Sequence, residues 1–351
     1  MVEQTWQNMT AQMAFDGQPA QLFELTNTVG MSVVLMDIGA CVLSCRLPLA
    51  CGEQREVVLG VGTMTDFERQ ASYMGVTVGR YANRIAKGKF FIDGQPYQLE
   101  QNQAGNCLHG GKLGFNKVRW QVVEHSACHV LFRYRSADGE QGFPGNLVVE
   151  ALYRLTEQGA LEIHYSAKTD AKTPVNLTNH SYFNLDGAEA GIDVRQHQLW
   201  IDAQQYLPTD STGVPAGSLA SVIGSGFDFT TEKVIARDFL SDDQQQAAKG
   251  YDHSYYFEPN RDTNQAVARL TSQDKKVAMS VITDKPAMQL YTGNWLSGTP
   301  SRSGEYSDYA GVALESQFLP DSPNHPEWPQ PDCILHPEQE YRFTTCYLFH
   351  I

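Results

Sequence analysis

Short stretches in which apolar and polar residues alternate recur along most of the chain. Alternation of this kind places successive side chains on opposite faces of an extended strand, so that one face can be buried while the other meets water. Strand character is found at 31–38, 40–47, 89–92, 97–99, 120–123, 130–134, 147–155, 161–167, 276–283 and 341–349. Because few helical patterns separate these stretches, the sequence predicts an all-β fold, a large antiparallel β-sandwich with few short helices.

Turn and helix signals refine this prediction. Asp93 and Gly94 separate two candidate strands and predict a tight hairpin, because both central residues of such a turn favour positive φ. Helical periodicity is convincing only over 232–240 and 242–249. The proline-rich segment 318–331 is also aromatic, which favours an ordered loop over a flexible linker. Since no repeat or low-complexity linker divides the chain, we expect a single domain over residues 1–351.

Composition narrows the classes of partner. The 351 residues carry a formal net charge of -14, which disfavours nucleic acid and anionic membrane surfaces, because both require clustered Lys and Arg. The sequence starts with no secretion signal and holds no apolar run of about 18 residues that would span a bilayer. Seven cysteines at scattered spacings favour reduced thiols, so we expect a cytoplasmic protein. For its oligomeric state we expect either a monomer or a homodimer.

The segment 175–185 carries an unusual set of polar side chains. Asn176, Thr178, His180, Tyr182 and Asn184 alternate with other residues, so an extended chain would present them on one face. These groups both donate and accept hydrogen bonds and include aromatic faces, which indicates a hydroxyl-rich ligand such as a carbohydrate. His180 is the side chain best suited to proton transfer near neutral pH. The alternative is a histidine that only satisfies hydrogen bonds in the core.

A second candidate is Glu315, the one charged residue in the apolar, strand-like run 311–319. It shares a strand side with Ala313 and Gln317, so it can face either a lined cleft or solvent. A carboxylate in apolar surroundings can have its pKa raised into the range of a general base. The alternative is an exposed glutamate on an edge strand.

Two glycine-containing motifs supply further candidates. His109 directly precedes Gly110 and Gly111, where backbone can approach a ligand closely, although turn formation alone would explain the glycines. The segment 79–85 carries Arg80 and Arg84, which can bind sugar hydroxyls or pair with a buried carboxylate. For Arg80 a structural ion pair is equally compatible with the sequence.

Metal and nucleotide sites have weaker signals. His125, Cys128 and His129 offer ligand atoms, but their neighbours read as strands, where this spacing forms no helical ligand pair. The glycines at 60–62 and 224–226 lack the strand-to-helix context of a phosphate-binding loop or a nucleophile elbow. We therefore expect no metal and no cofactor.

Six motifs in order along the chain resemble those of one family. They are Gly-Arg-Tyr-Ala-Asn-Arg-Ile at 79–85, Leu-His-Gly-Gly at 108–111, Gln-Gly-Phe-Pro-Gly-Asn at 141–146, Asn-His-Ser-Tyr-Phe-Asn-Leu at 179–185, Gly-Tyr-Asp-His at 250–253 and Leu-Glu-Ser-Gln-Phe at 314–318. Together they resemble the galactose mutarotases, or aldose 1-epimerases. The loop 318–332 is similar to one that bacterial members carry, and the resemblance runs nearly end to end.

The resemblance implies a large antiparallel β-sandwich without metal or cofactor, acting on a small aldose such as D-galactose or D-glucose. It implies that Glu315 is the base, that His180 is the acid and that His109 assists near the ring oxygen. The residues that it assigns to substrate binding are Asn83, Arg84, His109, His180, Ser181, Tyr182, Asp252 and Gln289. The preference among aldoses stays open.

Three other functions remain to be separated from this one. An epimerase for hexose 6-phosphates would need cationic groups at the rim of the site, and Arg84 is the one candidate. A glycoside hydrolase would need two carboxylates across the scissile bond, for which Glu315 and Asp252 are available. A sugar-binding module would use the same pocket without catalysis.

Overall fold

The computed structural model describes residues 2–50 and 52–351, and its largest element is a nine-stranded antiparallel sheet. Its strands, in spatial order, are β10 (Gln121–His125), β11 (His129–Ser136), β12 (Leu147–Leu155), β13 (Ala160–Thr169), β29 (Tyr341–His350), β23 (Ala278–Thr283), β22 (Ala266–Thr271), β17 (Gln198–Ile201) and β20 (Lys233–Val234). The last strand of the chain, β29, therefore joins the two halves of this sheet. Burial alternates along β12 and along β13 from Leu161 onward, which reflects the two-residue period of a strand with one face in the core.

A six-stranded sheet forms the second layer. Its order is β16 (Tyr182–Phe183), β27 (Val312–Gln317), β24 (Ala287–Tyr291), β21 (Asp252–Tyr256), β18 (Gln205–Leu207) and β19 (Ala220–Ser221). A separate sheet near the N-terminus contains β1 (Leu22–Thr26), β2 (Ser32–Met36), β3 (Cys41–Pro48) and β4 (Gln54–Glu56). Both sheets are antiparallel throughout.

Short elements complete the fold. The two-stranded pairs are β5 (Thr77–Val78) with β15 (Thr178–Asn179), β6 (Arg84–Ile85) with β9 (Cys107–Leu108), β7 (Lys89–Ile92) with β8 (Gln95–Gln98), β14 (Thr173–Pro174) with β28 (Ile334–Leu335), and β25 (Thr299–Pro300) with β26 (Glu305–Tyr306). The α-helices are α1 (Val2–Ala11), α2 (Met64–Arg69) and α3 (Asp243–Ala248). Within the described residues, no helix is long and apolar enough to cross a membrane.

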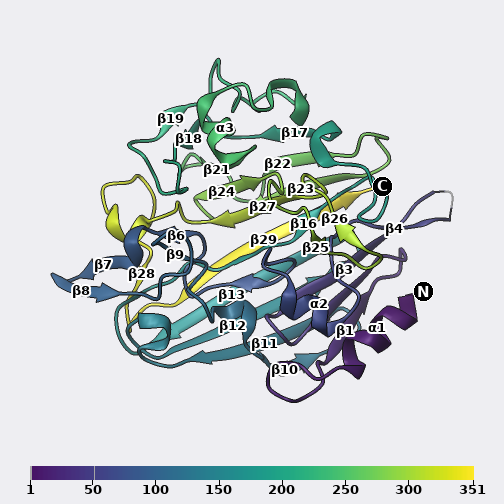
Figure 1. Ribbon diagram of the computed structural model, residues 1–351, viewed down its shortest axis with the longest axis horizontal. Coiled ribbons are helices and arrows are strands. Elements are labelled where there is room, and N and C mark those ends of the chain that lie inside the picture. The colour runs from purple at the N-terminus through teal and green to yellow at the C-terminus, as the bar shows by residue number, and fades with distance from the viewer. Residues whose placement is uncertain (1, 51) are drawn as a thin grey trace.

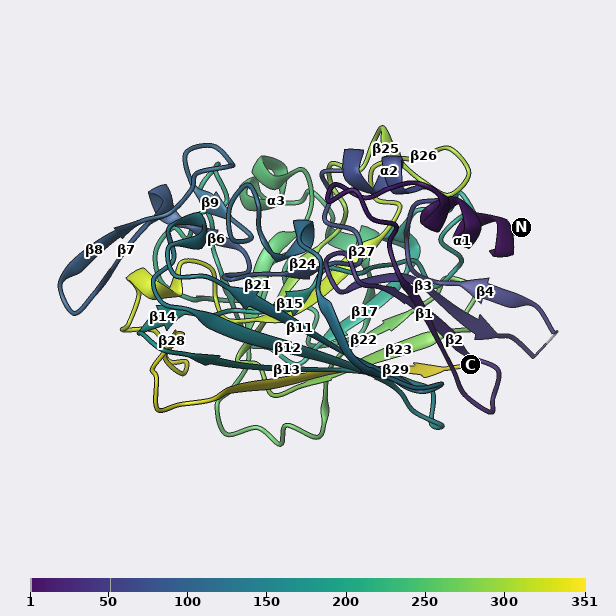
Figure 2. The same cartoon turned by 90° about the horizontal axis from the view of Figure 1, so that it is seen from below.

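The layers are visible in two views. In Figure 1 the long strands of the nine-stranded sheet run across the molecule, and the β7–β8 hairpin projects from one end. Figure 2 shows the long strands on one side and α2, α3, β25 and β26 on the opposite side. The short strands β6 and β9 lie on the same side as α3, away from the long strands (Figure 2).

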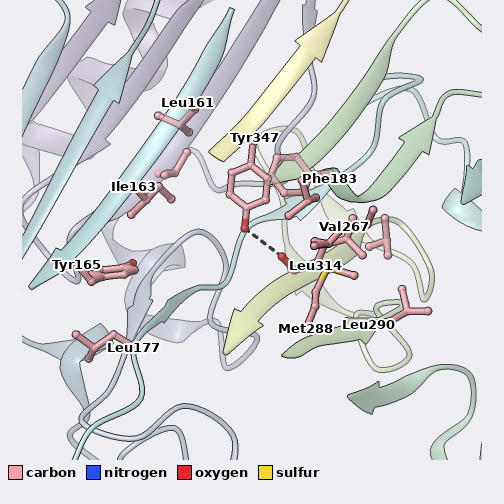
Figure 3. Packing of buried hydrophobic residues seen from close by; sticks show 14 of the residues in the cluster. Leu161, Ile163, Tyr165, Leu177, Phe183, Val267, Met288, Leu290, Leu314 and Tyr347 are labelled. Carbon is pink, nitrogen blue, oxygen red and sulfur yellow. Dashed lines mark hydrogen bonds between the residues drawn. The ribbon is translucent and has the colours of Figure 1, made fainter. Parts of the chain in front are cut away.

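The main core lies between the two sheets. Leu161 and Ile163 from β13 and Tyr347 from β29 pack with Met288, Leu290 and Leu314 from the six-stranded sheet (Figure 3). The Tyr347 hydroxyl donates a hydrogen bond of 3.1 Å to the Leu314 carbonyl, which is the contact drawn in Figure 3. Apolar burial on this scale is the dominant favourable contribution to folding.

The predicted β-sandwich class is confirmed, and most predicted strands overlap observed ones. The Asp93-Gly94 turn is confirmed, since φ is 51° and 78° at these residues. The predicted helix 242–249 appears as α3, but 232–240 contains the strand β20 and the 3-10 helix Ile235–Asp238 in place of an α-helix. The loop 318–331 is ordered around a 3-10 turn at Ser322–Asn324. Residues 175–185 do not form one strand, because β15 pairs with β5 and β16 pairs with β27, in different sheets.

Candidate active site

Glu315 owes its position to alternation along β27. Leu314 points into the core between the sheets, so Glu315 points to the opposite face of the six-stranded sheet. Cross-strand partners share a face, and the partner of Glu315 is Gln289. A neighbouring row on the same face is formed by Tyr182, Ala313, Tyr291 and Asp252, which pair successively across β16, β27, β24 and β21. The sheet register thus gathers polar side chains that lie far apart in the sequence.

His180 lies in the short link between β15 and β16. Its backbone N–H donates to the Val76 carbonyl at 2.9 Å, and its carbonyl accepts from the Gly75 N–H at 2.9 Å. These bonds hold the imidazole over the face that carries Glu315. The distance from His180 Nε2 to Glu315 Oε1 is 3.5 Å, and both side chains are at most 5% exposed.

A cavity of about 200 Å³ opens above this pair. It has room for several water molecules, each of which takes about 30 Å³ in the liquid, and so for a small solute. The residues that line it are Ala71, Ser72, Tyr73, Asn83, Arg84, Gln103, Leu108, His109, His180, Tyr182, Asp252, Tyr291, Trp295 and Glu315. A concave site with convergent polar groups is the usual form of a small-molecule site.

The β6–β9 pair supplies a further set of polar groups. The His109 N–H donates to the Asn83 carbonyl at 3.0 Å, and the Asn83 N–H donates to His109 Nδ1 at 3.1 Å. Both residues have positive φ, 65° for Asn83 and 51° for His109. The next residue, Gly110, has φ of +87°, and a Cβ there would lie 2.0 Å from the Gly79 carbonyl oxygen. The glycine is required because two backbone segments approach each other closely.

Arg84 connects two walls of the cavity. Its Nε donates to Gln103 Oε1 at 2.8 Å, and its guanidinium lies 3.5 Å from Asp252 Oδ2. The other oxygen of Asp252 accepts from Gln289 Nε2 at 2.6 Å, and Gln289 in turn accepts from the Ser254 hydroxyl. The network fixes the Asp252 carboxylate beside the cavity, where it can accept hydrogen bonds from hydroxyl groups.

Burial shifts the pKa values of the ionisable groups in the cavity. Loss of hydration lowers the pKa of His180 to about 4 and holds the pKa of His109 well below its usual range. The same loss, together with the nearby charge of Asp252, raises the pKa of Glu315 well above its usual value. Both shifts favour the neutral form of the pair, in which the carboxyl group and not the imidazole carries the proton. A pair with perturbed pKa values in a cleft is typical of acid–base catalysis.

His109, His180 and Glu315 each offer one atom within 4.8 Å of the others, which raises the question of a metal ion. The hydrogen bond from the Asn83 N–H occupies the lone pair of His109 Nδ1. Neutral His109 therefore carries its proton on Nε2, which makes that nitrogen a donor and not a metal ligand. Two ligands remain, fewer than the three protein ligands of a typical catalytic zinc site. The arrangement favours proton transfer and hydrogen bonding.

The comparison with known families agrees with this geometry. Residues 21–348 match the family model described as aldose 1-epimerase. The chain belongs to the aldose 1-epimerase family. Among curated members, the aldose 1-epimerase of Escherichia coli K12 is 50% identical over 343 residues, which cover 97% of this chain and 99% of that protein. The human galactose mutarotase is 35% identical over 339 residues and 95% of each chain.

Solved structures of aldose 1-epimerase relatives share the fold. The aldose epimerase homologue from C. elegans superposes with a TM-score of 0.85 at 29% identity and covers 94% of this chain and 99% of its own. The galactose 1-epimerase from Lactobacillus acidophilus gives a TM-score of 0.83 at 28% identity, with 97% of both chains covered. The predicted membership of this isomerase family is therefore confirmed.

The cavity brings together most residues that the resemblance selected. Its lining includes Asn83, Arg84, His109, His180, Tyr182, Asp252 and Glu315. Gln289 lies one layer behind, where it holds Asp252. Ser181 is also absent from the described cavity lining, and its buried hydroxyl donates to Asn179 Oδ1 at 2.6 Å. The Ser181 hydroxyl therefore supports the turn between β15 and β16, and its contact with substrate stays a prediction.

Other members of the polar set around His180 also have structural roles. Asn176 is fully buried and donates to the Ala82 carbonyl at 3.1 Å. Asn184 donates to the carbonyls of Ile192 and Ala310. The idea of one continuous ligand-facing strand is thus wrong, because the amides at both ends satisfy buried backbone carbonyls.

Arg80 and the group formed by Cys128 and His129 both lie outside the cavity lining. Arg80 is buried away from the cavity and donates to Pro144 O at 2.8 Å and Gly145 O at 2.9 Å, so its role is structural. Cys128 is exposed, and its Sγ lies 3.9 Å from His129 Nδ1.

Three aromatic residues of the cavity lining were missed by the sequence reasoning: Tyr73, Tyr291 and Trp295. Tyr291 had a usable signal, since it is two residues from Gln289 on the same strand and therefore on the same face. Tyr73 and Trp295 lie in loops, where no period predicts which way a side chain points.

Proposed function

We propose that this protein interconverts the α and β anomers of an aldohexose such as D-galactose or D-glucose. The observation that carries the proposal is the buried His180–Glu315 pair, 3.5 Å apart, at the wall of a polar cavity. Two groups that exchange one proton are what ring opening and closure require, because one oxygen must lose a proton while another gains one. Membership of the aldose 1-epimerase family supports the same reaction.

Ring opening uses the ionised form of the pair. The Glu315 carboxylate takes the proton of the C1 hydroxyl, and the His180 imidazolium gives a proton to the ring oxygen. The bond between C1 and the ring oxygen breaks, its electron pair stays on the ring oxygen, and C1 becomes an aldehyde. Each positioned acid or base contributes typically about 10² to 10⁴-fold, because neither a free alkoxide nor an oxonium ion has to form.

Rotation about the C1–C2 bond then exposes the other face of the aldehyde. Closure uses the neutral form of the pair: the glutamic acid returns a proton to the carbonyl oxygen while the imidazole takes one from the attacking hydroxyl. The pKa directions favour this neutral form before sugar binds. Transfer of one proton from Glu315 to His180 converts the neutral form into the ionised form that opens the ring. Closure leaves the pair ionised again, so either anomer can be opened in the next cycle.

The remaining polar groups orient the sugar. Asp252 and Asn83 present oxygen atoms to the cavity, and Arg84 presents N–H donors. The Nε2–H that the tautomer of His109 provides is a donor suited to the ring oxygen or a neighbouring hydroxyl. Tyr182 supplies an aromatic surface for the C–H face of the ring.

The competing functions receive less support. Among the described residues that line the cavity, Arg84 is the one cationic side chain, and it already faces Asp252, which disfavours a sugar phosphate. A hydrolase that used Glu315 and Asp252 as its two carboxyl groups would leave the buried contact between His180 and Glu315 without a role.

Polarimetry of freshly dissolved α-D-galactose tests the proposal. We expect catalytic amounts of protein to accelerate the decay of optical rotation above the spontaneous rate. Saturable sugar binding without acceleration would indicate a binding module and contradict the proposal. Incubation with lactose followed by product analysis provides the control for hydrolysis, since a 1-epimerase releases no monosaccharide.

A further inference from the structure

Tyr73 is a cavity residue with an unusual backbone conformation. It lies between α2 and β5, and its φ of 57° is in the left-handed region that residues other than glycine rarely adopt. Conformations of this kind persist where the surrounding structure holds them, and they concentrate at functional sites. The side chain lines the cavity and also packs against a second apolar cluster, which includes Val76 and Ala82.

The ring of Tyr73 contacts both histidines of the site. Its centroid is 4.6 Å from that of His109 and 6.0 Å from that of His180, and the two imidazoles are 5.3 Å apart. The three rings therefore form a closed triangle in which each is packed against the other two. Loss of the Tyr73 ring would leave one side of each imidazole uncovered.

The backbone near Tyr73 is tied to His180. The Tyr73 carbonyl accepts from the Val76 N–H at 3.3 Å, while Gly75 and Val76 bond to both backbone groups of His180 at 2.9 Å. A shift of the Tyr73 loop would therefore displace the acid of the proposed mechanism.

The Tyr73 hydroxyl leads to His109 by a second route. It lies close to the side chain of Asn102 and interacts with it electrostatically. Asn102 accepts from the Leu108 N–H at 2.7 Å and donates to the Leu108 carbonyl at 2.9 Å, directly before His109. The phenol ring therefore lies between its own backbone and the turn that carries His109.

We propose that Tyr73 is a positioning residue, whose ring sets the separation and orientation of His109 and His180 and keeps water from the side of the cavity that they share. This inference rests on the proposed function, because it assigns Tyr73 a purpose only if the two imidazoles act on a sugar. It differs from a role in folding, since it predicts a change in the chemistry of His180.

Several groups face His180 and influence its titration. Glu315 lies at 3.5 Å, the charge of Asp252 also favours the imidazolium, and Arg84 lines the same cavity. Tyr182 and Tyr291 cover further sides of the ring, with centroids at 4.9 Å and 6.4 Å. Removal of Tyr73 leaves these contacts in place and admits water on one side alone, which weakens the desolvation that lowers the pKa of His180.

The test compares Tyr73→Asn with Tyr73→Phe. Asparagine tolerates positive φ, so Tyr73→Asn removes the ring while it preserves the backbone. We expect kcat to fall on the order of 10²-fold, as small displacements of catalytic groups do, with a much smaller change in KM. The acid limb of the pH profile should move from about 4 toward about 6.5, the usual pKa of histidine. Tyr73→Phe keeps the ring and should retain most activity and the acid limb.

Tyr97→Leu is the matched control, because Tyr97 also stacks on a ring, Phe90, but lies in the β7–β8 hairpin outside the cavity lining. It should change stability without moving the acid limb. Titration of His180 by NMR in Tyr73→Asn gives a readout independent of turnover and separates the two proposals. An inactive wild-type protein would refute the proposed function, whereas an active one with His180 titrating alike in wild type and Tyr73→Asn would overturn the role of Tyr73. If Tyr73→Asn fails to fold, Tyr73→Gly removes the ring with another residue that tolerates positive φ, and unchanged titration of His180 in that variant would overturn the role.

Discussion

The nine-stranded sheet and the cavity face of the six-stranded sheet differ in where they place polar side chains. Along β12 every second side chain is buried and apolar, and polar residues such as Glu150 and Arg154 reach solvent. Along β27 all six residues are buried, and on the cavity face Glu315 Oε2 and Gln317 Oε1 have no hydrogen-bond partner among the described residues. Buried polar atoms without partners lower stability. The nine-stranded sheet stabilises the fold, whereas the cavity face of the six-stranded sheet holds reactive groups and lowers the stability of the fold.

The largest expected effect belongs to Glu315→Gln, which keeps the shape of the side chain and removes its basicity. We expect kcat for mutarotation to fall at least about 10² to 10⁴-fold, the contribution of a positioned base, with little change in KM. Because the raised pKa means that the folded state binds a proton more tightly, Glu315 stabilises the fold less as pH rises through that pKa. The variant should therefore be at least as stable as wild type at alkaline pH, as measured by urea denaturation.

Glu68→Gln provides the control for that substitution, since Glu68 is exposed on α2. It should leave both kcat and stability unchanged. Wild-type turnover in Glu315→Gln would show that the carboxylate takes no part in the mechanism. The cavity face would then no longer differ from the nine-stranded sheet in function.

The opposite result is expected for Ile163→Ala in β13. Ile163 is fully buried between the sheets, and truncation to alanine at such sites costs about 2 to 5 kcal/mol of unfolding free energy. Under conditions where the variant is folded, kcat should equal that of wild type. A selective loss of kcat in the folded variant would show that the two regions are not separable.

The pH profile probes the cavity face alone. Activity should fall below about pH 4, where His180 gains a second proton for the pair, and should fall again on the alkaline side as the last proton leaves Glu315. An unshifted pair would place these limbs near about 4.3 and 6.5. Circular dichroism at each pH separates titration of the site from acid unfolding, to which buried His197 and His253 contribute as pH falls from about 6.5 toward 4. A rate independent of pH on both sides would contradict the shared-proton mechanism.

The smallest effect is expected for Tyr347→Phe, at the contact between the two regions. The substitution removes the hydrogen bond to the Leu314 carbonyl and should cost about 1 kcal/mol of stability. Since Leu314 directly precedes Glu315, kcat reports whether this bond also positions the carboxylate. We expect kcat to change less than about tenfold, that is, by less than about 1.4 kcal/mol in barrier height. A larger loss of kcat would show that the hydrogen bond between Tyr347 and Leu314 in the core also sets the position of Glu315.

Regular strands were accessible to prediction from sequence because their pattern is local. The strand 147–155 coincides with β12, and the Asp93-Gly94 hairpin is present as expected. Glu315 and His180 were also identifiable, since each is a titratable residue in a segment that otherwise reads as buried. In such cases the signal lies in residues that contradict their surroundings.

Other features depend on contacts that no local pattern contains. The segment 175–185 divides because its two short strands pair with Thr77–Val78 and with β27, which belong to different sheets. Ser181 follows that division and turns toward Asn179. Tyr73 looks like an ordinary residue of a turn, and its closeness to His109 and His180 arises from the way three separate loops meet.

The position of β29 between β13 and β23 has a consequence for how the molecule assembles. The segment that bridges the two halves of the large sheet follows all the other strands of that sheet in the chain, so the halves cannot be joined before this segment has been synthesised. Long-range pairing of this kind slows folding and leaves unpaired edges exposed meanwhile. The nine-stranded sheet should consequently be completed late in folding, once β29 has inserted between β13 and β23.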